Sequence, residues 1–500
     1  MHTVKLLLKT TAYDKFEIEK RFHACNNVHN ALVSHAGKLL KQLDHDTEYQ
    51  QLLSEYISLL KTQGNNKRKS EISKELSQTR KSIGLTEYSL QSYIKTYGKQ
   101  FSKCLSSNQV QKEATRVWHG IQKILFSDGE NLHFKRFHDL TTIGGKSNNN
   151  GVKFDKETLS IKWIGLDIKC KRPKESTLDY ISEALNDDIS YCEIKREMFP
   201  NGYHYYAIVY LKGNPPSKDR LIGKDTTGID PGTSTIAAVS DTTVTLMELA
   251  PNTKRYNKEI TKLQRSMDKS LRTMNPNKFN PDGTVKKGNR EKWIFSKHYR
   301  KMRNKLRSTY RKKQAYIKQF HEIACNKLLE NSRNFIIEKM NYKALQKRSK
   351  NTEKQDNPSE VKNKDGTVKV IRKYKRKKRF GRSLNNRSPG LFLAILKRKA
   401  TQYGGTYTEV DTRSFKASQY NHVTDDYQKV TLSERFKMIG DNRIQRDLYS
   451  AFLIRNTDST MTHPDRNKCL KAFDNFGKLH DNLIATMKHN GISMKPCFGF

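Results

Sequence analysis

A β-rich stretch near the middle of the chain contains the pentapeptide Gly228-Ile229-Asp230-Pro231-Gly232, followed by a run rich in Thr, Ile, Ala and Val. β-formers interrupted by Pro-Gly predict a strand, a tight turn and a second strand, with Asp230 at the end of the first strand. α/β folds place ligand-binding groups beyond such strand ends. Aspartate also opens many ordinary turns, so the pentapeptide alone leaves a purely structural role open.

Two further acids occur in patterns that bring a carboxylate to the end or the inner face of an element. Residues 334–338 form a short apolar run that ends in Glu338 and predicts a strand. Residues 444–452 have helical spacing, with Asp447 on or beside the apolar face. A buried carboxylate needs a metal ion or a base as its partner. Asp230, Glu338 and Asp447 therefore predict a divalent-cation site, and hard oxygen ligands favour Mg²⁺ or Mn²⁺.

The chain is strongly basic. It has 500 residues, with 95 Lys and Arg against 51 Asp and Glu, which gives a formal net charge of +44. The length predicts two to four domains, and the charge predicts a polyanionic partner such as nucleic acid. A ribosomal-type binder without chemistry would share this charge, but the three acids at element ends argue against that reading.

Cysteine usage and hydropathy indicate a cytoplasmic protein. None of the seven cysteines forms a C-x-x-C pair, and a disulfide framework is not expected in a chain this large and basic. The apolar run at residues 6–8 is too short for a signal peptide. No stretch approaches the roughly 18 apolar residues of a membrane span, so we expect no membrane partner.

The first half of the chain changes from helical to strand-like patterns near residue 129. Residues 1–14 contain one predicted strand, over 4–10, and residues 15–128 repeat apolar residues at helical spacing, which predicts an antiparallel bundle. Strand-like runs in residues 129–221 alternate with turn sequences. These predicted strands are Thr158–Trp163, Leu166–Cys170, Tyr191–Arg196 and Tyr203–Leu211. Together with the first strand they predict a small β-barrel.

The second half, residues 222–500, alternates strands with helices in an order that matches an RNase H-like fold. Two long apolar stripes predict a helical insertion over about 254–330. Residues 347–382 are polar and end in a basic run, so we expect a flexible segment that orders on nucleic acid. The later predicted elements are a helix over 391–403, a strand over 406–410, the helix with Asp447 and a final helix over 470–491.

Cationic side chains crowd one face of the second insertion helix and the end of the polar segment. A basic helix face is often only solvated, but the overall charge favours contact with phosphates. The predicted nucleic-acid-binding residues are Lys301, Arg303, Lys305, Arg307, Arg311, Lys312, Arg376, Lys377 and Lys378. Lys313 belongs to the same crowded helix face.

Taken in order, Gly228–Gly232, Ile336–Glu338 and Arg446-Asp447 resemble the three RuvC motifs of TnpB, the OrfB protein of bacterial insertion sequences. That family is related to the type V CRISPR effectors. Residues 410–413 and Ala417-Ser418-Gln419 resemble the stretch before the family's zinc ribbon. The resemblance is clear over residues 222–500 and loose in the first half.

The resemblance implies a multidomain α+β fold. A helical recognition region (15–128) would be inserted in a small β-barrel wedge domain (1–14 and 129–221). An RNase H-like RuvC domain (222–500) with a helical insertion would follow.

For function, the resemblance implies a transposon-associated, RNA-guided DNA endonuclease, a hydrolase of the prokaryotic cytoplasm and nucleoid. Its partners would be a guide RNA encoded near the element and a double-stranded DNA target with a short flanking motif. Asp230, Glu338 and Asp447 would hold two Mg²⁺ ions, for which Mn²⁺ can substitute, with Asp230 bridging them. Arg413 is a candidate accessory contact to phosphate.

The sequence departs from the family where the zinc ribbon belongs, at about 414–442. This segment has no cysteine, and His422 alone is not a zinc site, so we expect no zinc. Tyr449 stands where the family commonly has Asn. The missing ribbon leaves open an RNA-guided repressor that binds without cleaving. A guide-independent transposase or resolvase on the same fold is a third reading, which the large first half disfavours.

Overall fold

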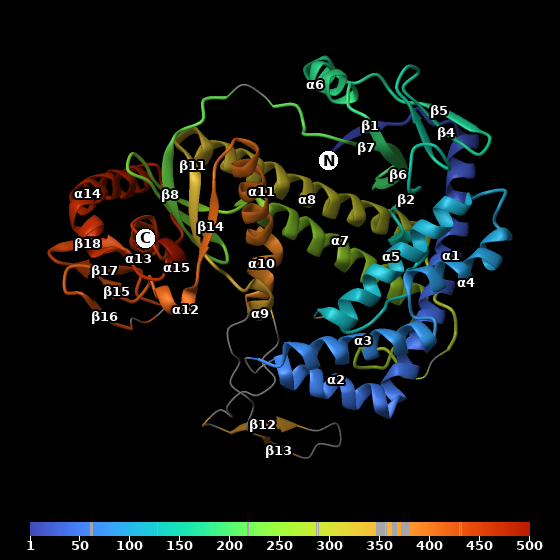
Figure 1. The fold of residues 1–500 in the computed structure, drawn as a ribbon, viewed down its shortest axis with the longest axis horizontal. Coiled ribbons are helices and arrows are strands. Elements are labelled where there is room, and N and C mark those ends of the chain that lie inside the picture. The colour runs from blue at the N-terminus through green and yellow to red at the C-terminus, as the bar shows by residue number, and fades with distance from the viewer. Residues whose placement is uncertain are drawn as a thin grey trace. The chain divides into compact units, whose positions relative to one another are not determined.

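The computed structural model describes most of the chain, in two compact units, Met1–Lys218 and Asp219–Phe500 (Figure 1). The described residues are 1–60, 64–127, 129–217, 220–286, 288, 290–346, 356, 358–362, 368–371, 380–429, 431 and 433–500. Most of the predicted flexible segment, including Arg376, Lys377 and Lys378, lies outside them. Within that segment, β12 (Ser359–Lys362) and β13 (Val368–Ile371) pair as an antiparallel hairpin.

The first unit begins with one strand and then a series of helices. These are α1 (Ala12–His45), α2 (Thr47–Leu60), α3 (Asn66–Ser82), α4 (Glu87–Lys99) and α5 (Ser107–Phe126). A capping box fixes the start of α1. The Thr11 hydroxyl accepts the Asp14 N–H at 3.1 Å, and the Asp14 carboxylate accepts the Thr11 N–H at 2.8 Å. Two backbone donors at the helix N-terminus are thereby satisfied.

The strands of the first unit form two open sheets. The larger sheet has the order β1 (His2–Leu7), β7 (Gly202–Leu211), β6 (Ile189–Phe199), β2 (Thr142–Gly144), with antiparallel neighbours. The smaller sheet has the order β3 (Lys153–Asp155), β4 (Ser160–Trp163), β5 (Leu166–Lys169).

The predicted β-barrel is wrong. Closure requires the two edge strands of a sheet to pair, but among the described residues β1 and β2 each have one partner strand. The sheets meet through an isolated bridge between Leu8 and Cys170. A helix that the sequence analysis did not predict, α6 (Glu175–Leu185), follows β5.

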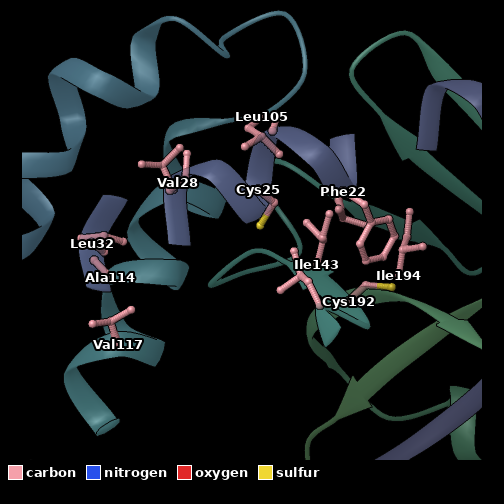
Figure 2. Packing of buried hydrophobic residues seen from close by; sticks show 14 of the residues in the cluster. Phe22, Cys25, Val28, Leu32, Leu105, Ala114, Val117, Ile143, Cys192 and Ile194 are labelled. Atoms are coloured by element: carbon pink, nitrogen blue, oxygen red, sulfur yellow. The ribbon is translucent and has the colours of Figure 1, made fainter. Parts of the chain in front are cut away.

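The core of the first unit joins its helices to its larger sheet. One stripe of α1, with Phe22, Cys25 and Val28, is buried against α5 and against β2 and β6 (Figure 2). These three side chains are at most 1% exposed. Residues three apart lie on one helix face, which is why this stripe faces the core along several turns. Each such side chain contributes about 1.5–3 kcal/mol by its burial.

The second unit is built on a five-stranded mixed sheet. Its order is β10 (Val244–Glu248), β9 (Thr235–Val239), β8 (Asp225–Pro231), β11 (Ser332–Glu338), β14 (Tyr407–Val410). The first three strands are antiparallel, and β8, β11 and β14 are parallel. β9 is buried on both faces, so Ala237 and Val239 enter one core while Ile236 and Ala238 enter the other.

Helices cover both faces of this sheet (Figure 1). The helices of the second unit are α7 (Thr253–Met274), α8 (Lys297–Asn331), α9 (Tyr342–Gln346), α10 (Gly381–Arg387), α11 (Pro389–Gln402), α12 (Thr412–Phe415), α13 (Arg446–Arg455), α14 (Arg466–His489) and α15 (Lys495–Phe498). Residues of α8 and α11 belong to one core, and residues of α13 and α14 belong to the other. No helix in the described part of the chain is long and apolar enough to cross a membrane.

Two short hairpins occupy the region that the resemblance assigned to a zinc ribbon. β15 (Tyr420–Asn421) pairs with β16 (Asp426–Tyr427), and β17 (Phe436–Ile439) pairs with β18 (Asn442–Gln445). Ile444 therefore lies in a strand, and its prediction as a helical residue is wrong. The helix begins at Arg446, where the Gln445 side chain accepts the Leu448 N–H at 2.8 Å.

Candidate active site

Asp230 and Glu338 are brought together by the parallel pairing of β8 with β11. In that pairing Ile229 lies opposite Ile337, and both isoleucines are fully buried in the core shared with α8 and α11. Side chains alternate along a strand, so the next residue of each strand faces the opposite side of the sheet. Asp230 and Glu338 consequently occupy neighbouring positions at the carboxyl ends of two parallel strands.

Asp447 approaches from α13, which crosses β8 on the face toward which Asp230 points. Gly228 makes this crossing possible. A Cβ at this position would lie 2.3 Å from the Ala451 carbonyl oxygen and 2.4 Å from the Arg455 nitrogen. Both are backbone atoms of α13. Asp447 lies in the first turn of this helix, near the end of β8.

The three predicted acids line one pocket of about 550 Å³. Arg435, Arg446 and Lys429 also line it, beside the turn that follows Asp230. The sequence analysis did not assign these cations to a site, although Arg446 is part of the third motif. Arg413 is exposed on α12 and is not among the lining residues.

Burial and mutual repulsion dominate the electrostatics of the acids. Desolvation, followed by the charges of Glu338 and Asp447, raises the pKa of Asp230 well above its usual value, and Arg446 and Arg435 oppose this. Desolvation raises the pKa of Glu338 to about 7. Asp447 instead has cationic neighbours: Arg446 Nη2 lies 3.2 Å from Oδ1 and Arg435 Nη1 lies 3.8 Å from Oδ2.

The chemistry of this donor set fits a divalent cation. Three carboxylates in a desolvated pocket supply hard oxygen ligands, and a bound cation would offset the burial and the neighbouring negative charges that raise the pKa of Asp230. Among the described residues, no three His, Cys, Asp or Glu side chains are arranged to hold one metal ion. The acids share a pocket, and two arginines contact one of them.

Tyr342 on α9 supports the turn that follows Asp230. Its hydroxyl donates to the carbonyl oxygens of Pro231 and Gly232, each at 3.4 Å. Burial, followed by the nearby Asp230 charge, raises the pKa of the Tyr342 phenol. Tyr342 stays protonated and therefore remains a donor to this turn. Sequence reasoning missed this residue because it follows β11 by only a short connection and carries no motif.

An aromatic cluster packs beneath the β15–β16 hairpin, in the segment for which we expect no zinc. The His422 ring is fully buried, with Nδ1 2.8 Å from the Tyr449 hydroxyl, which also accepts the His422 N–H at 3.1 Å. Phe452 and Phe473 pack on this ring, at centroid distances of 5.9 and 4.7 Å. His422 and Tyr449, both singled out in the sequence, are thus direct partners.

The predicted basic helix face lies on α8, and its residues differ in exposure. Lys301, Lys305 and Lys312 are exposed. Arg303, Arg307 and Arg311 are half-buried. Lys313 does not belong to this face, because it is 3% exposed and its ammonium donates to two asparagine side chains. The sequence shows the charge of Lys313 but not the polar pocket that buries it.

No protein-family model matches the sequence, and no curated protein matches it. The solved structures that align with most of the chain include two complexes determined by cryo-EM. A cryo-EM structure of a Cas12f1–sgRNA–target DNA complex has 9% identity and a TM-score of 0.44, covering 91% of this chain and 98% of that chain. A cryo-EM structure of a CRISPR–Cas12f ternary complex has 12% identity and a TM-score of 0.29, covering 91% and 99%.

Proposed function

We propose that this protein is a metal-dependent, RuvC-type, RNA-guided DNA endonuclease of the TnpB kind. The observation that carries the proposal is the meeting of three carboxylates in one pocket. Asp230 and Glu338 are 108 residues apart (338 − 230), and Glu338 and Asp447 are 109 apart (447 − 338). The sheet order β10-β9-β8-β11-β14 supports an RNase H-like domain as the scaffold.

The chemistry is hydrolysis of a phosphodiester bond. Two bound Mg²⁺ ions supply an activated water and neutralise charge on the phosphate. Asp230, Glu338 and Asp447 would hold them, and the resemblance of the three motifs implies that Asp230 is shared by both ions. Arg435 and Arg446 line the same pocket and are placed to attract the anionic strand. Tyr342 holds the turn beside Asp230.

The proposed partners are a guide RNA encoded near a transposable element and a double-stranded DNA target with a short flanking motif. The net charge of +44 supports a polyanionic partner. The guide and the transposon association rest on the resemblance of the three motifs. Base pairing by a guide would supply sequence recognition, while the protein contacts the backbone.

A second candidate, an RNA-guided binder that represses without cleaving, is favoured by one observation. Arg446 and Arg435 contact Asp447, and an acid already paired with arginine is a weaker metal ligand. The nuclease proposal therefore requires that these two arginines give up their contacts with Asp447 when the metal ions bind.

The test is to extract and sequence RNA from the purified protein, then to programme cleavage of a matched plasmid with and without Mg²⁺. We expect one enriched RNA species and cleavage that needs both the RNA and Mg²⁺ or Mn²⁺. Binding without cleavage, under every flanking sequence in a randomised library, would establish the repressor. Cleavage that proceeds equally without RNA would establish a guide-independent nuclease.

A further inference from the structure

A groove of about 740 Å³ lies between α7 and α10 in the second unit. Its lining contains six cationic side chains and no carboxylate; the cations are Lys254, Lys258, Lys262, Arg265, Arg382 and Arg387. The four on α7 recur every three or four residues, so they lie on one helix face. An α-helix rises 1.5 Å per residue, so this row is about 16 Å long.

The protein neutralises few of these charges. Glu248 pairs with Arg387, and its carboxylate lies 3.8 Å from Lys254 Nζ. Within the described ranges, Lys258, Lys262, Arg265 and Arg382 have no carboxylate within ion-pair distance. Like charges along one wall of a groove raise the local positive potential, which favours an anionic ligand.

A buried cation lies beneath the groove. Lys313 on α8 is 3% exposed, and its ammonium donates to the side-chain oxygens of Asn257 and Asn386 at 3.0 and 2.7 Å. No carboxylate in the described part of the chain pairs with Lys313, and burial lowers its pKa. A buried ammonium without a counter-ion is costly. An anion in the groove would offset that cost.

Asn257 and Asn386 link the buried cation to the groove, because both line it. An ammonium has only donors, so it holds each amide oxygen toward itself. The NH₂ group of each amide then remains to donate to another acceptor. Asn386 is only 9% exposed and lines the groove, so its amide is a donor in the groove wall. A phosphate oxygen, which only accepts, is a suitable partner.

We propose that this groove binds the phosphate backbone of one strand of a nucleic-acid duplex, an inference that rests on the proposed nucleic-acid function. The lining consists of Lys, Arg, Asn and Thr, so it contacts phosphates without reading base edges. Sites for single strands typically add aromatic side chains on which bases stack, and this lining has none. A row of about 16 Å matches roughly five base-pair steps of 3.4 Å along a duplex axis.

The test compares the full chain with the variant K258Q/K262Q/R265Q in binding to fluorescent duplexes of DNA, of RNA and of RNA–DNA hybrid, all of one sequence. If three phosphate contacts are lost, the slope of the logarithm of the binding constant against the logarithm of the salt concentration should become less steep by about 2.7. A fourfold increase in salt should therefore weaken wild-type binding about 40-fold more than it weakens the variant. The duplex that shows the largest loss identifies the ligand.

The control K327Q/K471Q/K478Q removes the same charge from exposed positions on α8 and α14 outside the groove. It should retain the wild-type slope to within about one unit. Equal losses in the two triple variants would overturn the groove proposal while leaving the nucleic-acid function intact. Failure of the wild type to bind any duplex, with or without copurified RNA, would instead overturn the proposed function.

Asn386→Asp separates ligand binding from folding. The new carboxylate supplies a counter-ion to Lys313, so the melting temperature should not fall. The same change replaces an amide donor with an acceptor that repels phosphate. We expect the duplex Kd to rise at least tenfold at unchanged melting temperature. An unchanged Kd in this variant would contradict a phosphate site above Asn386.

Discussion

Tyr449 and His422 show how two buried polar side chains can serve as each other's hydrogen-bond partner. The Tyr449 hydroxyl contacts both the backbone N–H and Nδ1 of His422. Burial, with a smaller effect from the nearby Arg466 guanidinium, lowers the pKa of His422 to about 4. The folded protein therefore holds a neutral histidine at the place where the resemblance expects a metal ligand region. We predict that this region binds no zinc, and elemental analysis of the purified protein checks this.

The neutral His422 predicts acid sensitivity. In the unfolded chain a histidine takes up a proton near pH 6.5, whereas folded His422 resists protonation until about pH 4. The unfolded state binds more protons in this window, so the contribution of His422 to the free energy of unfolding should fall by up to about 3 kcal/mol as the pH falls from 6.5 to 4. Urea denaturation at about pH 7 and about pH 5 measures this. His422→Gln should lose most of that dependence, and the exposed-site control His489→Gln should keep it. Identical pH dependence in wild type and His422→Gln would contradict a buried neutral ring.

At the scale of elements, the crossing of α13 over β8 determines whether the site forms. A Cβ on Gly228 would meet backbone atoms of α13, which cannot rotate away as a side chain can. Gly228→Ala should therefore lower the free energy of unfolding by about 1–3 kcal/mol and displace Asp447 from the pocket. The control Gly477→Ala lies on α14 with open space around its Cβ, and should be neutral or stabilising by about 1 kcal/mol. Urea denaturation compares the two; equal stability of both variants would show that α13 tolerates displacement.

The sequence predicted those elements whose pattern is local. β8 is a run of β-formers broken by a Pro-Gly turn and β11 is a short apolar run, each with an acid near its end, so the positions of Asp230 and Glu338 followed from them. The barrel was wrong because pairing of edge strands depends on residues far apart in the chain. The burial of Lys313 was missed for the same reason, since its partners Asn257 and Asn386 are 56 and 73 residues away. Ile444 was misassigned because a four-residue strand runs directly into a helix.

At the scale of the whole molecule, the groups proposed for binding and those proposed for cleavage are distributed differently. The cations number 95 and occur throughout the chain. The acids of the site are three, and they meet in one pocket. Affinity for nucleic acid is a sum over many phosphate contacts. Cleavage depends on a few groups that act as a unit. Removing one of them lowers the cleavage rate nearly as much as removing several. Loss of one acid should therefore separate the two activities.

Asp230→Ala is the sharpest test of this separation. It should lower the cleavage rate by roughly 10³ or more, because the ions that Asp230 is proposed to bridge would both be misplaced. Guide and target binding should stay near the wild-type level, because no phosphate contact is removed. Plasmid cleavage with Mg²⁺ beside a gel shift on the same target measures both quantities.

Glu338→Ala and Asp447→Ala should behave alike, and combining them should add little. Asp474→Ala removes an exposed acid of α14 and should cut normally. Near wild-type cleavage by Asp230→Ala would mean that the three acids meet for a reason other than catalysis.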